Sequence, residues 1–314
     1  MSRFLVTGGA GFIGGHITEL LVSEGHEVVV FDDFSTGTEA NLAAVADRVR
    51  VVRGDVRDIE ALNAVMPGTD YVIHQAAEIS PVRSVEDPAF TNSVNVDGTL
   101  NVLISAKNAG VRRFVFASSC SIYGDTGRQA QREDFAPCPL SPYGASKMAG
   151  EHYAAVFYLI YGLETVRLRY FNVFGPRQNP ESQYAAVIPK FIDRILRGQE
   201  LHIYGDGEQT RDFVYVENVA RANYLACLAE EAAGEAFNIA GEHTVNLNEL
   251  VEMLTRLAGR QVGVVYDPPV VGDIRHSASD ISKARALLGF SPAVTFGEGL
   301  ERTFDYFAAK SGAV

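Results

Sequence analysis

Residues 3–14 read RFLVTGGAGFIG, a short apolar run followed at once by spaced glycines. The run Arg3–Thr7 predicts a buried strand, and the apolar-periodic residues Phe12–Ser23 predict a helix directly after the glycines. A glycine fingerprint between a strand and a helix is typical of a dinucleotide-binding site. This stretch therefore predicts the first unit of an α/β fold and the place where its cofactor binds.

The spaced glycines each have a predicted role. Gly8 permits the tight turn, Gly11 lets the backbone approach a pyrophosphate, and Gly14 lets helix and strand pack closely. The helix N-terminus then directs unpaired N–H groups and the positive end of its dipole at the phosphates. We expect this stretch to contact the cofactor through Gly8, Gly11, Phe12, Ile13 and Gly14.

An acidic pair closes the second predicted strand. Residues Glu27–Phe31 predict a strand that ends at Asp32 and Asp33. An acidic residue about 20 residues beyond the glycines accepts hydrogen bonds from the ribose of NAD, and its charge would repel the extra phosphate of NADP. We therefore predict NAD as the cofactor, with Asp32 as the ribose ligand and Asp33 beside it.

Two further strand ends are expected in the same site. Predicted strands occupy Val49–Arg53 and Asp70–Ile73. An acidic side chain follows the first and is placed to meet the adenine amino group, and small side chains follow the second and let the cofactor lie against the strand ends. The residues expected at the cofactor are Asp55, Val56, Ala76 and Ala77.

Length and composition limit the classes of protein. The chain has 314 residues, which suits one large domain or two intimately joined ones. Its hydrophobic content of 47% is ordinary for a globular protein, and its net charge of −12 argues against a nucleic-acid partner. The three cysteines have neither metal-ligand nor disulfide spacing, so we expect no metal site. With no signal peptide and no apolar run of membrane-spanning length, we expect a cytoplasmic protein without a membrane partner.

The pattern of segments divides the chain in two. Residues 1–172 alternate strand-like and helix-like segments and predict an NAD-binding, doubly wound parallel Rossmann sheet. From residue 173 the spacing becomes irregular and Pro and Gly more frequent, so residues 173–314 are predicted to form a smaller C-terminal α/β domain that binds the substrate. Some of its segments are expected to return to the sheet. Its predicted helices are Tyr184–Arg197, Glu217–Glu230 and Asn246–Leu257, the last opened by a capping box.

Two long helices are expected, at Pro88–Ala109 and Tyr143–Tyr161. Both have more apolar positions than one packing face needs. They are therefore either deeply buried or paired with a second subunit, and we expect a homodimer formed through them.

Tyr143 and Lys147 lie four residues apart and share one face of the second long helix. Tyrosine is a poor base at neutral pH because its ordinary pKa is near ~10. The ammonium of Lys147, together with a positively charged nicotinamide, is expected to lower that pKa, so that Tyr143 can take a proton from a substrate hydroxyl. Ser119 follows the fifth predicted strand, Arg113–Ala117, and is expected to orient or relay the same proton. We predict Ser119, Tyr143 and Lys147 as the catalytic residues.

The chain resembles the extended short-chain dehydrogenase/reductase family, in particular the UDP-hexose 4-epimerases, over nearly its whole length. The glycine run and YGASK belong to this resemblance, but later blocks are more specific. They are SSCSIYGD (118–125), RYFNVFGPRQNP (169–180), YAAVIPKF (184–191), YGDGEQTRDFVYVENV (204–219) and GDIRHSASDISKA (272–284).

The resemblance implies NAD-dependent 4-epimerisation of a UDP-hexose, UDP-Glc/UDP-Gal, and so a part in galactose metabolism. Tyr143 would remove the 4-hydroxyl proton, the C4 hydride would pass to NAD⁺ and return to the other face of a 4-keto sugar, and Ser119 and Lys147 would assist. Asn95 and Tyr170, with Tyr143 and Lys147, would contact the cofactor. The UDP-sugar would contact Ser119, Tyr143, Asn172, Val187, Tyr204, Arg211, Asp273 and Ser277.

Within these substrate contacts, Asn172 and Arg211 would hold the diphosphate, a role that suits a guanidinium. By itself, Arg211 would be read as a surface ion-pair partner of Asp212. The family usually carries a further arginine where this chain has Val270. Arg275 or Arg177 is a candidate to replace it.

Relatives of the 4-epimerases remain as alternatives. Sugar 4,6-dehydratases and decarboxylases of the family carry an acidic residue beside the catalytic serine or threonine, whereas Ser119 is followed by Cys120 and Ser121, which favours simple epimerisation. A net NAD-dependent oxidoreductase and an idle NAD-binding regulator also stay open. Ser277 aligns with the family position near C2 of the sugar. Its small size predicts that UDP-GlcNAc/UDP-GalNAc are accepted as well, unless Ser277 is a loop residue facing solvent.

Overall fold

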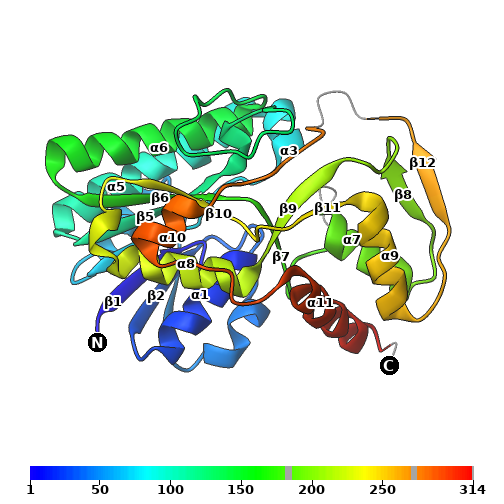
Figure 1. Cartoon of the computed structure of the whole chain (residues 1–314). Coiled ribbons are helices and arrows are strands. Elements are labelled where there is room, and N and C mark those ends of the chain that lie inside the picture. Colours follow the sequence, from blue (N-terminus) through cyan, green and yellow to red (C-terminus); the bar gives the residue numbers. More distant parts are fainter. Residues whose placement is uncertain (181–185, 270–273, 313–314) are drawn as a thin grey trace.

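The computed structural model describes residues 1–180, 186–269 and 274–312. Figure 1 shows a large sheet with helices on both faces and, beside it, a smaller group of strands and helices. The sheet has seven parallel strands in the order β10-β6-β5-β4-β1-β2-β3. Its strands are β1 (Arg3–Thr7), β2 (Glu27–Asp32), β3 (Val49–Arg53), β4 (Tyr71–His74), β5 (Arg113–Ser119), β6 (Glu164–Tyr170) and β10 (Ala236–Ile239).

The predicted doubly wound parallel sheet is confirmed, and its order fixes where a ligand can bind. The strand order reverses at β1, which pairs with β2 on one side and with β4 on the other. Ligands of such sheets bind beyond the carboxyl ends of the strands at this switch point. The glycine run directly follows β1 and therefore lies at that point.

Alternation along the strands sends apolar side chains to both faces of the sheet. Phe4 and Val6 pack with Ile17 of one helical layer, whereas Leu5 packs with Leu62 in the other. The first layer contains α1 (Phe12–Ser23), α8 (Val216–Leu228) and α10 (Ser282–Leu288), and the second contains α2 (Ile59–Val65), α5 (Gly98–Ala109) and α6 (Pro142–Tyr161). Burial on both faces explains why the central strands β1, β2 and β4 are almost continuously apolar.

The expected helix over Pro88–Ala109 contains a π-helical turn. The chain runs through α4 (Pro88–Asn92), a π turn (Ser93–Asp97) and α5 without a break. A π turn inserts an extra residue and is common at functional sites. The turn contains Asn95, one of the residues expected at the cofactor. Shorter helices are α3 (Pro81–Glu86), η1 (Glu39–Val45), η3 (Cys120–Ile122) and η4 (Glu230–Ala232).

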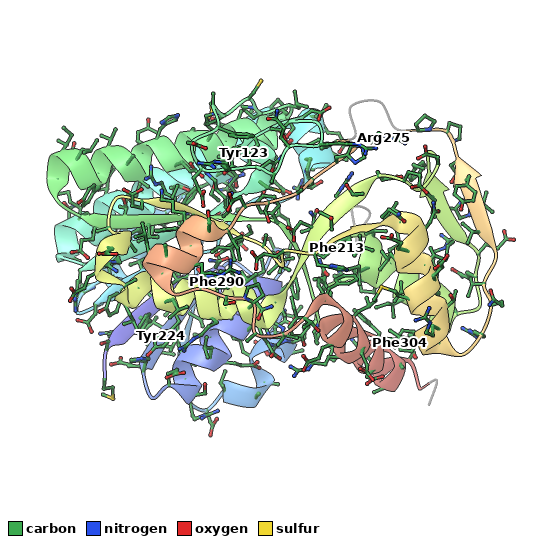
Figure 2. All side chains as sticks on the ribbon, viewed as in Figure 1. Tyr123, Phe213, Tyr224, Arg275, Phe290 and Phe304 are labelled. Atoms are coloured by element: carbon green, nitrogen blue, oxygen red, sulfur yellow. The ribbon has the colours of Figure 1, made fainter. Side chains whose placement is uncertain are left out.

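The smaller group has a core of its own. Phe213 and Phe304 belong to this second core, whereas Phe290 packs in the core of the large sheet, as Figure 2 shows. The strands of the smaller group are β7 (Asn172–Phe174), β9 (Thr210–Tyr215), β11 (Thr244–Asn246), β8 (Leu201–Tyr204) and β12 (Val264–Asp267). Its helices are α7 (Val187–Leu196), α9 (Leu247–Ala258) and α11 (Phe296–Ser311). The capping box at Asn246 is confirmed.

The chain returns to the large sheet after entering the smaller group, as predicted. Strand β10 pairs with β6, and α8 packs against α1. The division of the chain at residue 173 stays a prediction. Within the described ranges, no helix is long and apolar enough to cross a bilayer.

Candidate active site

Backbone contacts fix the glycine turn after β1. Gly8 has a φ of +67°, and a Cβ there would lie 2.7 Å from the backbone nitrogen of Ala76. A Cβ on Gly14 would overlap the carbonyl oxygen of Gly8. A side chain at either position would therefore push apart the turn, the start of α1 and the loop that follows β4.

Asp32 holds this turn from the end of β2. Its carboxylate is buried and accepts hydrogen bonds from the backbone N–H groups of Ala10 (2.9 Å) and Phe34 (2.8 Å). Burial raises the pKa of Asp32, although these two bonds oppose the shift. A carboxylate has about four lone-pair sites, so Asp32 keeps acceptor capacity for a ribose hydroxyl while it shapes the turn.

The residues predicted for the glycine run and the first four strand ends line one cavity. They are Gly8, Gly11, Phe12, Ile13, Gly14, Asp32, Asp33, Asp55, Val56, Ala76 and Ala77. A glycine cradle, an exposed helix N-terminus and acidic side chains at the strand ends together fit NAD.

Further residues line this cavity beyond those that the sequence assigned as cofactor contacts. They are Phe31, Ser35, Thr36, Gly54, Gln75, Ile79 and Val94. Ser35 and Thr36 follow the acidic pair after Phe34, so their place just beyond a strand end was a usable signal. Val94 lies in the π turn, and no sequence signal marked it as a lining residue.

Tyr143, Lys147 and Ser119 meet beyond the end of β5. Lys147 is only 4% exposed, and its Nζ donates a 2.8 Å hydrogen bond to the carbonyl of Ala117. Its Nζ lies 6.0 Å from the centre of the Tyr143 ring. Ser119 ends β5, and its hydroxyl lies close enough to Tyr143 to oppose the rise in the pKa of that phenol. The structure therefore brings the three predicted catalytic residues together.

The lowered pKa of Tyr143 that the sequence predicts depends on a bound nicotinamide, and the protein by itself shows the opposite shift. Burial raises the pKa of Tyr143 to about 12, and the hydroxyl of Ser119 opposes this only in part. Burial also lowers the pKa of Lys147 to about 7, which weakens the positive charge that was expected to stabilise the phenolate.

Asn95 fastens the loop after β4 to the first turn of α6. Its side-chain amide donates to the carbonyl of Glu78 and to Oγ of Ser146, both at 2.9 Å, and its oxygen accepts from the N–H of Glu78 at 2.8 Å. Ser146 in turn donates to the carbonyl of Tyr143 at 2.8 Å. Asn95 lies outside the cavity lining, so its contacts orient the residues around the cavity.

Tyr170 lies one layer behind the same cavity. Its hydroxyl donates to Oδ1 of Asn223 at 2.8 Å and accepts from the amide of Gln75 at 2.9 Å. Gln75 is a lining residue of the cavity. Tyr170 therefore orients Gln75. Burial raises the pKa of the Tyr170 hydroxyl, which stays neutral.

The predicted substrate residues come from several segments of the smaller group. The amide of Asn172 donates to the carbonyl of Asp212 at 3.0 Å, and Arg211 lies close enough to Cys120 to oppose the rise in the pKa of that thiol. Ser277 is only 6% exposed, so it is not a loop residue facing solvent.

The remaining predicted positions differ in exposure. Val187 is half-buried at the start of α7, and Tyr204 is exposed at the end of β8. Asp273 and Val270 lie outside the described residues.

Arg177 does not replace the missing family arginine. Its guanidinium donates to both carboxylate oxygens of Glu19, at 2.6 and 2.8 Å, and to the carbonyl of Asn41 at 2.8 Å. These contacts tie it to the helical layer beside the glycine turn. Arg275 pairs with Asp206 at 2.7 Å and lies on the segment between the two groups of elements, as Figure 2 shows.

Comparisons with known proteins agree with this geometry. The NAD dependent epimerase/dehydratase family matches residues 4–240. A putative UDP-glucose 4-epimerase from Methanocaldococcus jannaschii is 38% identical, over 96% of this chain and 97% of that protein. A dTDP-glucose 4,6-dehydratase from Streptomyces niveus is 35% identical, over 97% of this chain and 92% of that protein.

Two solved structures superpose closely on the chain. A UDP-glucose 4-epimerase from Thermus thermophilus in complex with NAD has a TM-score of 0.90 and 40% identity, with 99% of this chain and 100% of that chain covered. A UDP-N-acetylglucosamine 4-epimerase from Methanobrevibacter ruminantium in complex with UDP-N-acetylmuramic acid has a TM-score of 0.94 and 38% identity, with 98% and 99% covered.

Proposed function

The chain belongs to the NAD-dependent epimerase/dehydratase family, within the extended short-chain dehydrogenase/reductases, and on that premise we propose that it interconverts UDP-hexoses at C4. The observation that carries this proposal is the meeting of Tyr143, Ser119 and Lys147 at the carboxyl edge of the sheet, next to the NAD cavity. This arrangement suits the removal of a proton from an alcohol.

The residues of the chain divide the proton chemistry among them. Tyr143 would take the 4-hydroxyl proton as the phenolate, a form that the positive charges of Lys147 and of a bound nicotinamide would favour, and would later return it. Ser119 accepts a hydrogen bond from the backbone of Ser121 at 3.1 Å, which leaves its own O–H free to donate to Tyr143 or to the sugar. Lys147 is held on Ala117 and keeps the phenol ring in place. Bound NAD⁺ supplies a hydride acceptor that gives the hydride back, so no cofactor is consumed.

The surroundings of Ser119 support epimerisation over elimination. Burial raises the pKa of the Cys120 thiol to about 12, so this group neither loses nor supplies a proton readily near neutral pH. Ser121 and Ile122 carry no acid. Dehydration or decarboxylation of a nucleotide sugar by a family relative is the alternative function, in keeping with the similarity to a dehydratase.

The UDP-sugar binds between the catalytic residues and the smaller group. Asn172 and Arg211 hold the diphosphate, and Ser277 faces C2 of the sugar. The small, buried Ser277 supports acceptance of an N-acetyl group, as does the likeness to a UDP-N-acetylglucosamine 4-epimerase. Val187, Tyr204 and Asp273 complete the set of proposed contacts.

A homodimer forms through α6 and the helices of residues 88–109. Figure 1 shows α6 along the outside of the large sheet, and Leu159 and Ile160 near its end are 74% and 70% exposed. Exposed Val156 and Ile160 lie four residues apart on one face of α6, and apolar side chains exposed together favour a second copy over solvent. Light scattering would test this, with Leu159→Glu expected to give monomers. A cytoplasmic location and a part in galactose metabolism stay predictions.

The function is tested by incubating the purified protein, without added cofactor, with UDP-Glc and separately with UDP-GlcNAc. Proton NMR of the anomeric region should show the galacto epimer in both tubes. An epimer from UDP-Glc alone would refute the role of Ser277 and keep the enzyme class. No epimer in either tube, with or without added NAD⁺, would refute 4-epimerisation of these sugars.

Ser277→Tyr tests the sugar pocket more directly. A ring at this buried position should abolish turnover of the N-acetyl pair and spare UDP-Glc. The same substitution at Ser282, an exposed residue of the same segment, is the matched control. Equal losses for both sugars would contradict the assignment.

A further inference from the structure

The carboxylate of Asp212 is almost completely buried beside the proposed substrate site. Asp212 lies on β9, directly after Arg211, and is only 1% exposed. Successive residues of a strand project to opposite faces. Arg211 and Asp212 therefore serve different sides of β9.

Donors from two other segments converge on this carboxylate. Its Oδ2 accepts a 2.5 Å hydrogen bond from Oγ of Ser279, and its Oδ1 accepts a 2.9 Å bond from the backbone N–H of Gly241. The carboxylate thus joins β9 to the loop after β10 and to the segment that contains Ser277.

That segment is held between two neighbours. On one side, Ser277 donates from its backbone to Thr210 at 3.1 Å. On the other side, the backbone of Gln131 bonds with Ala278 at 2.9 Å and with Asp280 at 3.0 Å. Ser279 therefore anchors through its side chain a short stretch whose backbone is already paired, and this anchor lies two residues from Ser277.

Asp212 also contacts the diphosphate side of the site. Its carbonyl oxygen accepts the amide of Asn172 at 3.0 Å, which ties β7 to β9. One residue thus contacts Asn172, adjoins Arg211 and fixes the segment of Ser277. The catalytic residues are held separately, because Lys147 is bonded to Ala117 and the backbone of Tyr143 to Ser146.

We infer that Asp212 is a positioning residue for the substrate: through Ser279 it fixes the segment that presents Ser277 to the sugar. This inference rests on the proposed function, because that function makes Ser277 a sugar contact. Loss of the anchor should weaken binding of the UDP-sugar and leave the chemical step intact. The expected signature is a rise in KM without a matching fall in kcat.

The test compares three variants by steady-state kinetics with UDP-Glc and UDP-GlcNAc, and checks folding by thermal unfolding. Ser279→Ala removes the anchor, and its KM should rise about tenfold, the typical effect of losing a hydrogen bond to a charged group, with kcat within about twofold. Asp212→Asn keeps an acceptor for Gly241 and offers an amide to Ser279, so its KM should rise less. Ser282→Ala, on the same segment, is the control and should match the unmodified protein.

The outcomes separate the inference from the function on which it rests. An unmodified protein that turns over neither sugar contradicts the proposed function. An active unmodified protein whose Ser279→Ala variant keeps its KM, or loses kcat in place of affinity, contradicts the positioning role alone. Isothermal titration of UDP-Glc into the Tyr143→Phe protein, with and without Ser279→Ala, gives the same comparison without turnover.

Discussion

Around the cofactor cavity the backbone shapes the site, whereas on the substrate side buried side chains do. Gly8 and Gly14 leave no room for a Cβ, and the strands of the sheet bring the cavity residues to one edge. Asn172, Arg211 and Ser277 come from separate segments that meet through Asp212 and its hydrogen bonds.

The two sides should therefore respond differently to change. A substitution in the glycine turn acts on backbone geometry and cannot be absorbed by a rotamer change. A substitution among the hydrogen-bonded side chains of the substrate side loosens one segment. It changes the affinity for substrate by the free energy of a few hydrogen bonds. Between the two sides lies Tyr143, on which the proposed reaction depends.

Tyr143→Phe should give the largest effect, because neither side can replace the proton acceptor. We expect kcat to fall by about 10³-fold, within the range for loss of a general base. Bound NAD and the melting temperature should not change, since the backbone of Tyr143 is held by Ser84 and Ser146. Full activity of this variant would show that the proton acceptor lies elsewhere.

Gly14→Ala should give the next largest effect, confined to the cofactor side. The new Cβ would overlap the carbonyl oxygen of Gly8 and displace the turn from the start of α1. We expect this displacement to weaken NAD binding, so that the purified protein retains less NAD, measured by absorbance after gel filtration. Retention equal to that of the unmodified protein would contradict the idea that backbone contact sets this side.

The pH dependence of stability tests the substrate side. Burial raises the pKa of Asp212 to about 6, and nearby Glu242 acts in the same direction. The folded protein therefore binds this proton more tightly than the unfolded chain, whose Asp pKa is near ~3.9. This contribution to the free energy of unfolding is complete below the lower value and is lost as pH rises through the upper one.

A difference of about two pKa units should give a loss of about 3 kcal/mol. Urea unfolding of the unmodified protein and of Asp212→Asn, measured from pH 4 to pH 7, gives the difference. The free energies of unfolding of the two proteins should be most alike at low pH, where Asp212 is protonated, and should separate as pH rises. Parallel curves would show that Asp212 keeps its ordinary pKa.

Gly297→Ala should give the smallest effect, and it is the matched control for Gly14→Ala. Gly297 lies in α11, and a Cβ there meets nothing within 4 Å. Replacing a helical glycine should raise the free energy of unfolding by about 0.5–1 kcal/mol and leave NAD retention unchanged. A loss of NAD in this variant would show that the retention assay reports general destabilisation.

The difference between the two sides also explains what could be predicted from the sequence. Helix α1 and strands β1 and β3 have the predicted bounds, because period and glycine spacing are local signals. All cavity residues predicted from strand ends lie together, since parallel strands bring their carboxyl ends to one edge.

Features that depend on distant partners could not be predicted in this way. Arg177 adopts a φ of +71° and binds Glu19, far away in the sequence, so no local signal indicated that its guanidinium is paired there. The raised pKa of Tyr143 results from burial, which a motif does not report. The role of Asp212 likewise appears only when Ser279 is brought next to it.

The most direct test of the central claim uses UDP-glucose that carries deuterium at C4. A 4-epimerase returns the same hydride to the carbon that lost it, so the account predicts UDP-galactose with deuterium retained at C4, without added cofactor. Deuterium at C6 of a 4-keto-6-deoxy sugar would identify a dehydratase instead. Deuterium lost to solvent would contradict a hydride held within the enzyme between the two transfers.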